Sequence, residues 1–391
     1  MKRILFVMMS LQSGGAEKSL VNLLNEMNPQ KYEIDLLLFR KTGTFLSQVP
    51  SYVHICNIPA EINKLYGNMS QAGNLLGTKI IGTLATKVHE STPGARAGYR
   101  WEHYYTKKIP MLTKQYDVAF AYITGETMFY TVEKVQANRK ICFVHNDYKT
   151  ANHPKKYDYR YFEKLDGIAS ISKLCCDVLE EEFPEFSDKI WCIENITSSA
   201  VIKKRAVEFV PKEITGTNNI LSVGRLMSQK GFDLAISAAS ILKKRNMDFH
   251  WYIVGDGELR KDLENQIENE GLQSEFTILG IKENPYPYIK ACTIFAQTSR
   301  YEGKSVVLDE AKILAKPIVV TNYATVNDQI IDRREGIVVD MTPEGIANGI
   351  AELLGNKQLR KSLENYLSLH EYGNQREIEK YYKYIEGKRG C

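Results

Sequence analysis

The sequence predicts an α/β protein with two doubly wound domains. Short apolar runs typical of buried parallel strands alternate with helical patterns over the N-terminal half, and the alternation resumes from Ile220 to Val339. A length of 391 residues allows two domains that each bury a core. Two such blocks in succession suggest domains that face each other across a cleft.

The N-terminal block opens with strand Ile4–Met8, a loop that contains Gly14 and Gly15, and a helical pattern. Glycines in this position allow the backbone to approach a phosphate at the helix start. The loop matches neither the dinucleotide fingerprint nor the P-loop, and an ordinary tight turn explains it equally well. Further strands are predicted over Ile34–Phe39, Asp117–Tyr122, Lys140–His145 and Gly167–Ile171, with a helix over Cys175–Glu182.

His145 stands at the carboxyl end of one predicted strand. Open α/β sheets place their ligands at that end of their strands. A lone histidine is more often structural, but this position favours a role at the site.

The second block follows a charged, uneven stretch, up to Asn218, that we interpret as a linker. The predicted domains cover 1–200 and 201–370, and a C-terminal helix lies within 371–391. Predicted strands are Ile220–Val223, His250–Val254, Phe276–Leu279, Thr293–Ala296, Ile318–Thr321 and Gly336–Val339, with helices over Asp233–Lys244, Leu259–Glu270 and Val306–Ala315 and a largely helical segment from Glu344 to Lys388.

Two loops of the second block carry charged side chains that suit a phosphorylated sugar. Arg225 and Lys230 follow the first strand, where cations can neutralise a pyrophosphate. Glu302 lies in a loop before a helix with Ser305 as its expected N-cap, and Glu310 lies on that helix. Helix-start amides attract phosphate and carboxylates bind hydroxyls. Exposed surface charges remain the alternative interpretation.

Composition excludes several classes of protein. The net charge of +4 is too small to indicate nucleic-acid binding. The seven cysteines are scattered without a C-x-x-C spacing, so neither a disulfide framework nor a zinc site is expected, and a reducing cytosol fits. We also expect no metal at the phosphates, because the sequence has neither a D-x-D pair nor a histidine cluster. No apolar run is long enough to cross a bilayer, which predicts a soluble or peripheral protein.

The segment 62–114 is basic and rich in apolar and aromatic residues. It can lie on an anionic membrane or hold an anionic lipid-linked acceptor. An ordinary pair of amphipathic helices packed on its own domain is an equally good interpretation. Its basic residues are Lys64, Lys79, Lys87, Arg96, Arg100, Lys107, Lys108 and Lys114, against the acidic Glu90 and Glu102.

Five motifs, in this order, resemble the retaining glycosyltransferases of family 4. The resemblance covers nearly the whole chain and implies a GT-B fold, with two Rossmann-like domains facing across a cleft and a C-terminal helix that returns to the N-terminal domain. It also implies a donor on the C-terminal domain and an acceptor on the N-terminal one. The motifs are Gly14-Gly-Ala-Glu17, Val223-Gly-Arg-Leu226 with Lys230-Gly231, Ile253-Val-Gly-Asp-Gly257, Ser299-Arg-Tyr-Glu-Gly303, and Glu310-Ala311 with Lys316-Pro317.

The resemblance implies roles for individual residues. Arg225 and Lys230 would hold the diphosphate, and Glu310 the ribose hydroxyls. Glu302 would lie near the donor sugar, and His145 near the reacting sugar. The candidate catalytic residues are thus His145, Arg225, Lys230 and Glu302, and the candidate substrate-binding residues are Gly14, Gly15, Gly224, Gly303, Lys304, Ser305, Val306 and Glu310.

The chain departs from the family pattern at Ala315, where a glycine is usual before Lys-Pro, and in one longer segment. Thr321–Ile330 lacks the paired glycine and glutamate that many members carry, and this version resembles enzymes that build bacterial capsular or secreted polysaccharides. The expected activity is transfer, with retention and without metal or cofactor, of a hexose or N-acetylhexosamine from a nucleotide sugar. UDP is the expected carrier, and a lipid-linked saccharide at the inner membrane surface the expected acceptor. A non-catalytic nucleotide-sugar-binding partner and a sugar-nucleotide epimerase of the same fold are the alternatives.

Overall fold

A computed structural model describes residues 1–12, 14–302 and 304–387, and the chain forms two compact units. The N-terminal unit comprises Met1–Ile196 together with Arg376–Cys391, and the C-terminal unit comprises Thr197–Gln375. The expected boundaries at 200 and 370 lie a few residues from these. The last segment of the chain is thus part of the first unit.

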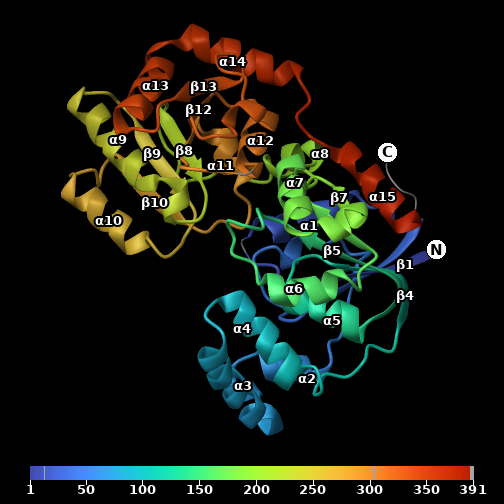
Figure 1. Ribbon diagram of the computed structural model, residues 1–391. Helices are drawn as coiled ribbons and strands as arrows, with labels where there is room; N and C mark the ends of the chain where they lie inside the picture. The colour runs from blue at the N-terminus through green and yellow to red at the C-terminus, as the bar shows by residue number, and fades with distance from the viewer. Residues whose placement is uncertain (13, 303, 388–391) are drawn as a thin grey trace. The chain divides into compact units, whose positions relative to one another are not determined.

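In the described residues, the N-terminal unit holds a parallel seven-stranded sheet of order β3-β2-β1-β4-β5-β6-β7 (Figure 1). The longer strands were predicted, with ends shifted by at most four residues. The two edge strands were missed because two or three residues show no periodicity. The strands are β1 (Lys2–Met8), β2 (Tyr32–Leu38), β3 (His54–Ile55), β4 (Gln115–Ala121), β5 (Gln136–Val144), β6 (Gly167–Ser170) and β7 (Ile190–Cys192).

Helices cover both faces of this sheet, which explains why its strands are apolar on both sides. On one face Phe6 stacks on Phe120, with ring centroids 5.0 Å apart, and Tyr381 from the last helix packs against Phe143. On the other face Trp101 lies fully buried. The helices are α1 (Gly15–Glu26), α2 (Ala60–Tyr66), α3 (Leu76–His89), α4 (Pro93–Arg100), α5 (Glu126–Lys134), α6 (Lys155–Phe162), α7 (Lys173–Glu182) and α15 (Ile378–Glu386).

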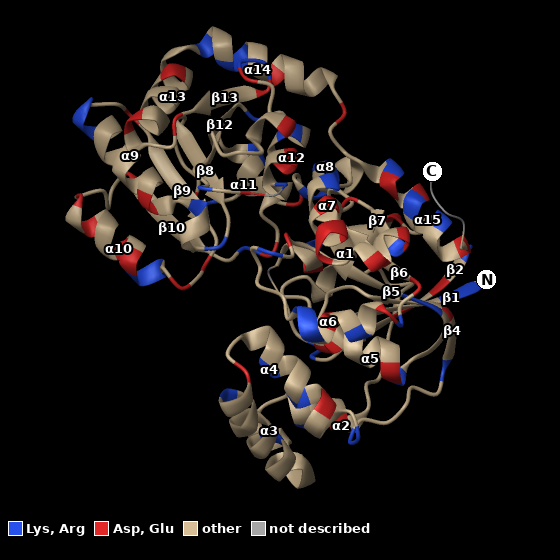
Figure 2. Cartoon of the chain, in the orientation of Figure 1, with Lys and Arg blue, Asp and Glu red and all other residues tan. Residues whose placement is uncertain are grey.

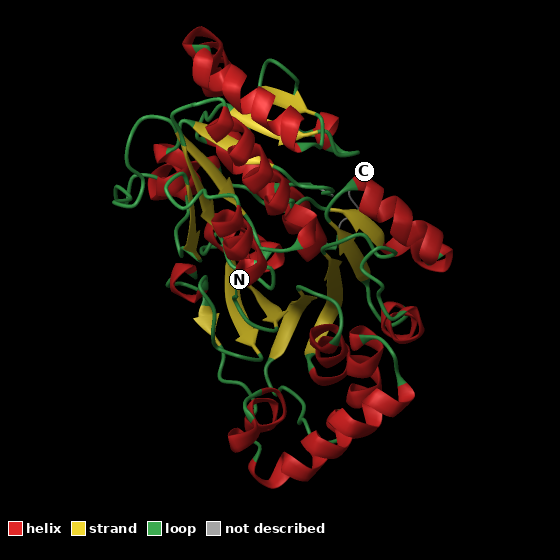
Figure 3. Cartoon of the chain, turned by 90° about the vertical axis from the view of Figure 1, so that its left-hand side faces the viewer, coloured by secondary structure: helices red, strands yellow, loops and turns green. Residues whose placement is uncertain are grey.

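The C-terminal unit holds a parallel six-stranded sheet, in the order β10-β9-β8-β11-β12-β13, and its strands also lie between helices (Figure 3). All six strands were predicted. They are β8 (Asn219–Val223), β9 (His250–Val254), β10 (Phe276–Gly280), β11 (Ile294–Gln297), β12 (Ile318–Thr321) and β13 (Gly336–Val339).

One element of this unit corrects the predicted linker. The helices are α8 (Ser199–Arg205), α9 (Phe232–Lys244), α10 (Arg260–Asn269), α11 (Tyr286–Ala291), α12 (Val306–Ile313), α13 (Pro343–Gly355) and α14 (Lys357–Leu369). The first of these falls within the stretch interpreted as linker, and Ile202 and Ala206 are buried in the core. A helix this short, with three basic residues in its last turn, gives little apolar signal.

In each sheet the direction in which successive strands are added reverses once. The candidate residues lie near these two reversals. Chain order reverses between β1 and β4 in one unit and between β8 and β11 in the other. Open α/β sheets bind ligands at the carboxyl ends of the strands beside such a switch point. Among the described residues, no helix combines the length and apolar character that a bilayer-spanning segment requires.

Candidate functional site

The loops that follow β8 and β11 meet at the switch point of the C-terminal unit, and they are in closest contact at Gly231. The short turn η6 (Ser228–Lys230) ends at this glycine, whose φ of 60° is left-handed. A Cβ at this position would lie 2.1 Å from the carbonyl oxygen of Thr298, so only glycine fits. The Thr298 hydroxyl in turn donates to the Lys230 carbonyl at 3.0 Å. The loop after β8 is therefore fixed against the loop after β11.

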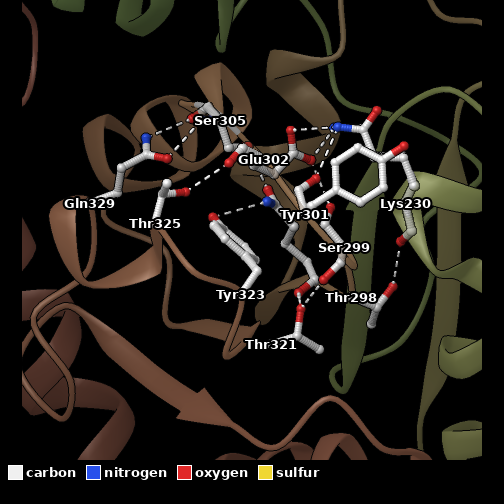
Figure 4. Close-up of polar contacts among 12 residues, drawn as sticks. Lys230, Thr298, Ser299, Tyr301, Glu302, Ser305, Thr321, Tyr323, Thr325 and Gln329 are labelled. Atoms are coloured by element: carbon white, nitrogen blue, oxygen red, sulfur yellow. Dashed lines mark hydrogen bonds and ion pairs between the residues drawn. The ribbon is translucent and has the colours of Figure 1, made fainter. Parts of the chain in front are cut away.

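This contact brings Lys230 and Glu302 together (Figure 4). The lysine Nζ donates to Glu302 Oε1 at 2.6 Å, and the Ser299 hydroxyl donates to the same oxygen at 2.7 Å. Gln229 Nε2 donates to the other carboxylate oxygen at 3.3 Å. Only 18% of the lysine side chain and 9% of the glutamate side chain are exposed, so the pair is shielded from water and held in one geometry.

At the start of α12, the hydrogen bonds of Ser305 differ from those of a usual N-cap. Ser305 occupies the N-cap position, but its hydroxyl makes no capping bond and donates instead to Gln297 Oε1 at 2.7 Å. Its backbone N–H donates to Gln329 Oε1 at 2.7 Å, and Gln329 Nε2 donates back to the Ser305 carbonyl at 3.1 Å. Ser305 is therefore the N-cap residue of this helix, as predicted, although its side chain does not supply the capping bond. Gly303, expected beside it, lies outside the described residues.

The atypical segment Thr321–Ile330 supplies these supports, a role that the sequence did not reveal (Figure 4). Besides Gln329, Thr325 donates its hydroxyl to the Glu302 carbonyl at 2.8 Å. Tyr323 accepts a hydrogen bond from Gln297 Nε2 at 3.4 Å. The segment thus fixes both the Glu302 loop and the first turn of α12. Its run of polar residues after a buried strand is the signal that could have revealed this role.

Further along α12 lies Glu310, whose side chain is fully buried. It follows Val306 by one helical turn and so lies on the same face. Burial raises the pKa of the adjacent Asp309 to about 6, and the positive charges of Lys304 and Lys312 oppose that shift. The first turns of this helix thus combine buried carboxyl groups with nearby cations.

Arg225 and Gly224 follow β8 directly, next to the strand that leads to Glu302. The arginine side chain is exposed and makes no hydrogen bond or ion pair with the described residues. A Cβ on Gly224 would lie 3.3 Å from the Lys230 side chain, so this glycine lets the lysine chain run close to the backbone. The structure therefore places Gly224, Arg225, Lys230 and Glu302 at one switch point.

In the N-terminal unit, His145 follows β5 and packs against Tyr122, with ring centroids 4.9 Å apart, and against Phe143. Burial lowers the pKa of His145 to about 4, although the Tyr122 backbone and the Asn195 side chain oppose the shift. The imidazole is therefore neutral at neutral pH and can accept one hydrogen bond and donate another. Gly15 begins α1 with open space where a Cβ would stand, and Gly14 precedes it.

A cluster of potential metal ligands that the sequence did not reveal comprises Asp35, His54 and Cys56. Asp35 already accepts hydrogen bonds from Lys114 Nζ at 2.8 Å and from the Tyr116 hydroxyl at 2.6 Å. The lysine places a positive charge where a cation would bind. We therefore do not regard the cluster as a metal centre.

Comparison with known proteins shows what the C-terminal unit is similar to. Residues 204–368 match the family described as "Glycosyl transferases group 1". The uncharacterized glycosyltransferase MJ1178 of Methanocaldococcus jannaschii is 31% identical over 190 residues, 45% of this chain and 52% of that protein. N-acetylgalactosamine-N,N'-diacetylbacillosaminyl-diphospho-undecaprenol 4-alpha-N-acetylgalactosaminyltransferase of Campylobacter jejuni is 30% identical over 206 residues, 52% of this chain and 55% of that protein. The chain thus spans about half the length of these two relatives.

Solved structures agree over the whole length. The crystal structure of Anabaena Alr3699/HepE in complex with UDP and glucose superposes with a TM-score of 0.68 at 16% identity and covers 100% of both chains. At this identity the match shows the fold, which is the GT-B fold that the motifs implied. Residues 204–368 of the chain are therefore similar to the group 1 glycosyltransferases.

Proposed function

We propose that this protein is a retaining glycosyltransferase that moves a hexose or N-acetylhexosamine from a UDP-sugar to a lipid-linked saccharide. The observation that carries the proposal is the Lys230–Glu302 pair, held by Gly231 at the switch point of the C-terminal unit, with Arg225 beside it. Cations and carboxylates fixed together at such a point suit a ligand with both phosphate and hydroxyl groups.

The charges of the side chains at this switch point explain the binding roles that we propose for them. An ammonium group has three donors, and the contact with Glu302 uses one, which leaves donors for phosphate oxygens. Arg225, exposed beside it, can hold the diphosphate through its forked guanidinium. Glu310 can bind ribose hydroxyls, and Glu302 the donor sugar. Lys304 and the amides at the start of α12 add positive potential.

The proposed reaction breaks the bond between the anomeric carbon and the phosphate oxygen and builds an oxocarbenium-like sugar. The acceptor hydroxyl attacks the face from which the diphosphate leaves and passes its proton to the departing phosphate oxygen. Lys230 and Arg225 stabilise the charge that grows on this leaving group. Because Lys230 is held in place by Glu302 and Arg225 lies beside it, we propose that the reaction needs no metal ion. His145 is proposed to meet a hydroxyl of the reacting sugar as a neutral imidazole.

Two similar proteins support the choice of donor and acceptor. Anabaena Alr3699/HepE was solved with UDP and glucose, which favours UDP as the carrier. The Campylobacter relative is named for an acceptor on diphospho-undecaprenol, which favours a lipid-linked saccharide here. We therefore propose a role in surface polysaccharide (capsule) biosynthesis at the cytoplasmic face of the cell membrane.

The direct test is an assay of the purified protein with membranes and a panel of UDP-, GDP- and ADP-sugars, each with and without EDTA. We expect nucleotide release and a new lipid-bound glycoside with one UDP-sugar, unchanged by EDTA. The anomeric configuration of the product, read by NMR, tests retention. Neither nucleotide nor glycoside from any sugar would contradict the proposal. Binding without turnover would indicate a non-catalytic partner, and altered free UDP-sugar without acceptor would indicate an epimerase.

A further inference from the structure

Helix α3 presents its large aliphatic side chains to solvent. Leu76, Ile80, Leu84 and Val88 follow one another at intervals of four residues, and Ile81 lies beside them, so all five share one face. Val88 is 82% exposed, Leu84 59% and Ile81 57%. Isolated exposed apolar residues are ordinary, but an unbroken stripe along a 14-residue helix, about 21 Å long, is a patch.

The opposite face, which packs on the unit, is small and polar. Gly82 and Thr86 are its buried residues. A Cβ added to Gly82 would lie 3.4 Å from the Tyr104 side chain, so this face fits closely against the segment that follows α4. Amphipathic helices of globular proteins normally bury their apolar face. In α3 the apolar face is exposed and the small, polar face is buried. The aliphatic stripe therefore contributes little to holding the unit together.

The helix that carries this stripe has two basic residues, Lys79 and Lys87, and no acidic one. No aspartate or glutamate occurs from Ile62 to His89, whereas Lys64, Lys79 and Lys87 lie in that segment. Lys87 is exposed and lies next to the stripe. Figure 2 shows α3 almost entirely without charge, with no acidic residue. Figure 1 shows α3 at the outer edge of its unit, beside α4.

We propose that α3 lies on anionic lipid membranes, with its aliphatic stripe (Leu76, Ile80, Ile81, Leu84 and Val88) in the acyl-headgroup boundary and Lys87 at the phosphates. A helix with an apolar face and basic but no acidic residues along its length binds in this way. The stripe carries only aliphatic side chains, whereas centres of protein interfaces favour tryptophan, tyrosine and arginine. Lipid therefore fits better than a protein partner.

This contact deepens the proposed function, because a lipid-linked acceptor would be met at the same surface. Its physical basis is independent of the transfer reaction, since it depends only on α3. Binding to vesicles can therefore be measured without nucleotide or acceptor.

The test is sedimentation of the full chain with vesicles of phosphatidylcholine alone or mixed with phosphatidylglycerol. We expect binding to the mixed vesicles that weakens with added salt. Leu84→Glu should lower the partition coefficient by about tenfold to hundredfold, because it places a charge where an aliphatic side chain was buried. Lys87→Glu should lower it by about tenfold through charge reversal. Leu369→Glu, at an 83% exposed leucine of α14, is the matched control and should bind like the unchanged protein.

Several results would overturn the proposal. These are no binding of the unchanged protein to either vesicle, or Leu84→Glu binding as well as the control. A dimer in analytical ultracentrifugation that Leu84→Glu dissociates, without vesicle binding, would assign the stripe to a second copy of this chain. Calorimetric titration with UDP, done without vesicles, separates the two proposals. If the protein binds UDP but not vesicles, the membrane contact alone is overturned. If it binds vesicles but not UDP, the nucleotide site alone is overturned.

Discussion

Lys230 has a fixed position in the C-terminal unit and a proposed role in the transfer reaction. Its ammonium group is bonded to Glu302 and shielded from solvent, and its backbone is fixed by the Thr298 hydroxyl. If it stabilises the leaving diphosphate, it acts more strongly in the transition state than in the bound substrate. Such a residue affects kcat more than KM.

The substitution Lys230→Ala should therefore lower kcat by about 100- to 1000-fold with a smaller change in KM, because one preorganised donor to the developing charge is lost. Steady-state kinetics with the UDP-sugar identified by the panel measure both constants. Lys244→Ala removes an exposed lysine from the end of α9 and serves as the control. Equal kcat values for the two variants would remove Lys230 from the mechanism.

Asp158 gives the stability of the N-terminal unit a dependence on pH. Its side chain is fully buried, and the Tyr148 hydroxyl donates to Oδ2 at 2.8 Å. Burial raises the pKa of Asp158 to about 7, and the tyrosine opposes the shift. Between about pH 4 and pH 7 the folded protein thus keeps a proton that the unfolded chain releases.

Because the folded state binds more protons in this range, the free energy of unfolding should fall as pH rises, by up to about 4 kcal/mol from this group. Asp158→Asn should abolish that part of the slope. Urea unfolding at about pH 5 and about pH 8 compares the two proteins. The prediction is wrong if the difference in unfolding free energy between them is the same at both pH values.

Among the elements, the turn from η6 into α9 determines where Lys230 lies. Gly231 and Gly271 are both left-handed, with φ of 60° and 65°, but a Cβ at Gly271 would meet nothing within 4 Å. Gly271→Ala should therefore cost only the backbone strain, about 1 to 2 kcal/mol. Gly231→Ala adds the clash with the Thr298 carbonyl and should destabilise by at least about 2 kcal/mol more.

Denaturant unfolding measures the two costs, and transfer kinetics should show a further loss only for Gly231→Ala, since that change also moves Lys230. Equal stability and activity of the two alanine variants would show that the contact between the loops is unimportant.

Helix α15, although last in the chain, belongs to the core of the N-terminal unit. Tyr381 is fully buried, its hydroxyl lies 3.2 Å from that of Tyr122, and its ring stacks on Phe143 at 5.5 Å. These two residues also contact His145. The helix therefore supports the aromatic surroundings of the candidate histidine.

Tyr381→Ala should cost about 3 to 5 kcal/mol through the cavity that it leaves. In hydrogen exchange we expect lost protection in β1, β4 and β5 and unchanged protection in β8, β9 and β11, because the helix belongs to the first unit. Lys383→Ala, at an exposed position of α15, is the control. Equal loss in strands of both units would contradict this assignment.

For the molecule as a whole, the sequence predicted the elements that have a strong period and missed those fixed by tertiary contacts. The buried strands were predicted because parallel sheets require apolar runs. Lys230 and Glu302 were chosen as candidates because each lies in a loop after such a strand. The strands β3 and β7 and the helix α8 were too short to show a period.

The hydrogen-bond partners of Ser305 were missed for the same reason. Ser305 has the residue type and position of an N-cap, but Gln297 and Gln329 compete for its hydroxyl and its amide. Neither partner can be recognised from local spacing, since Gln297 ends strand β11 and Gln329 follows the short helix η7 (Val326–Asp328). The inverted packing of α3 was equally hidden, because periodicity shows that a helix has an apolar face and not which way that face points.

The account as a whole depends on a nucleoside diphosphate binding to the C-terminal unit. Calorimetric titration of UDP into the unchanged protein, Glu310→Gln and the control Glu344→Gln tests this most directly. Glutamine keeps the buried shape of Glu310, so the loss of a charged partner for the ribose hydroxyls should weaken UDP binding by about tenfold to hundredfold. The control, at an exposed glutamate of α13, should bind like the unchanged protein. No binding to the unchanged protein, or equal affinity in all three, would contradict the account.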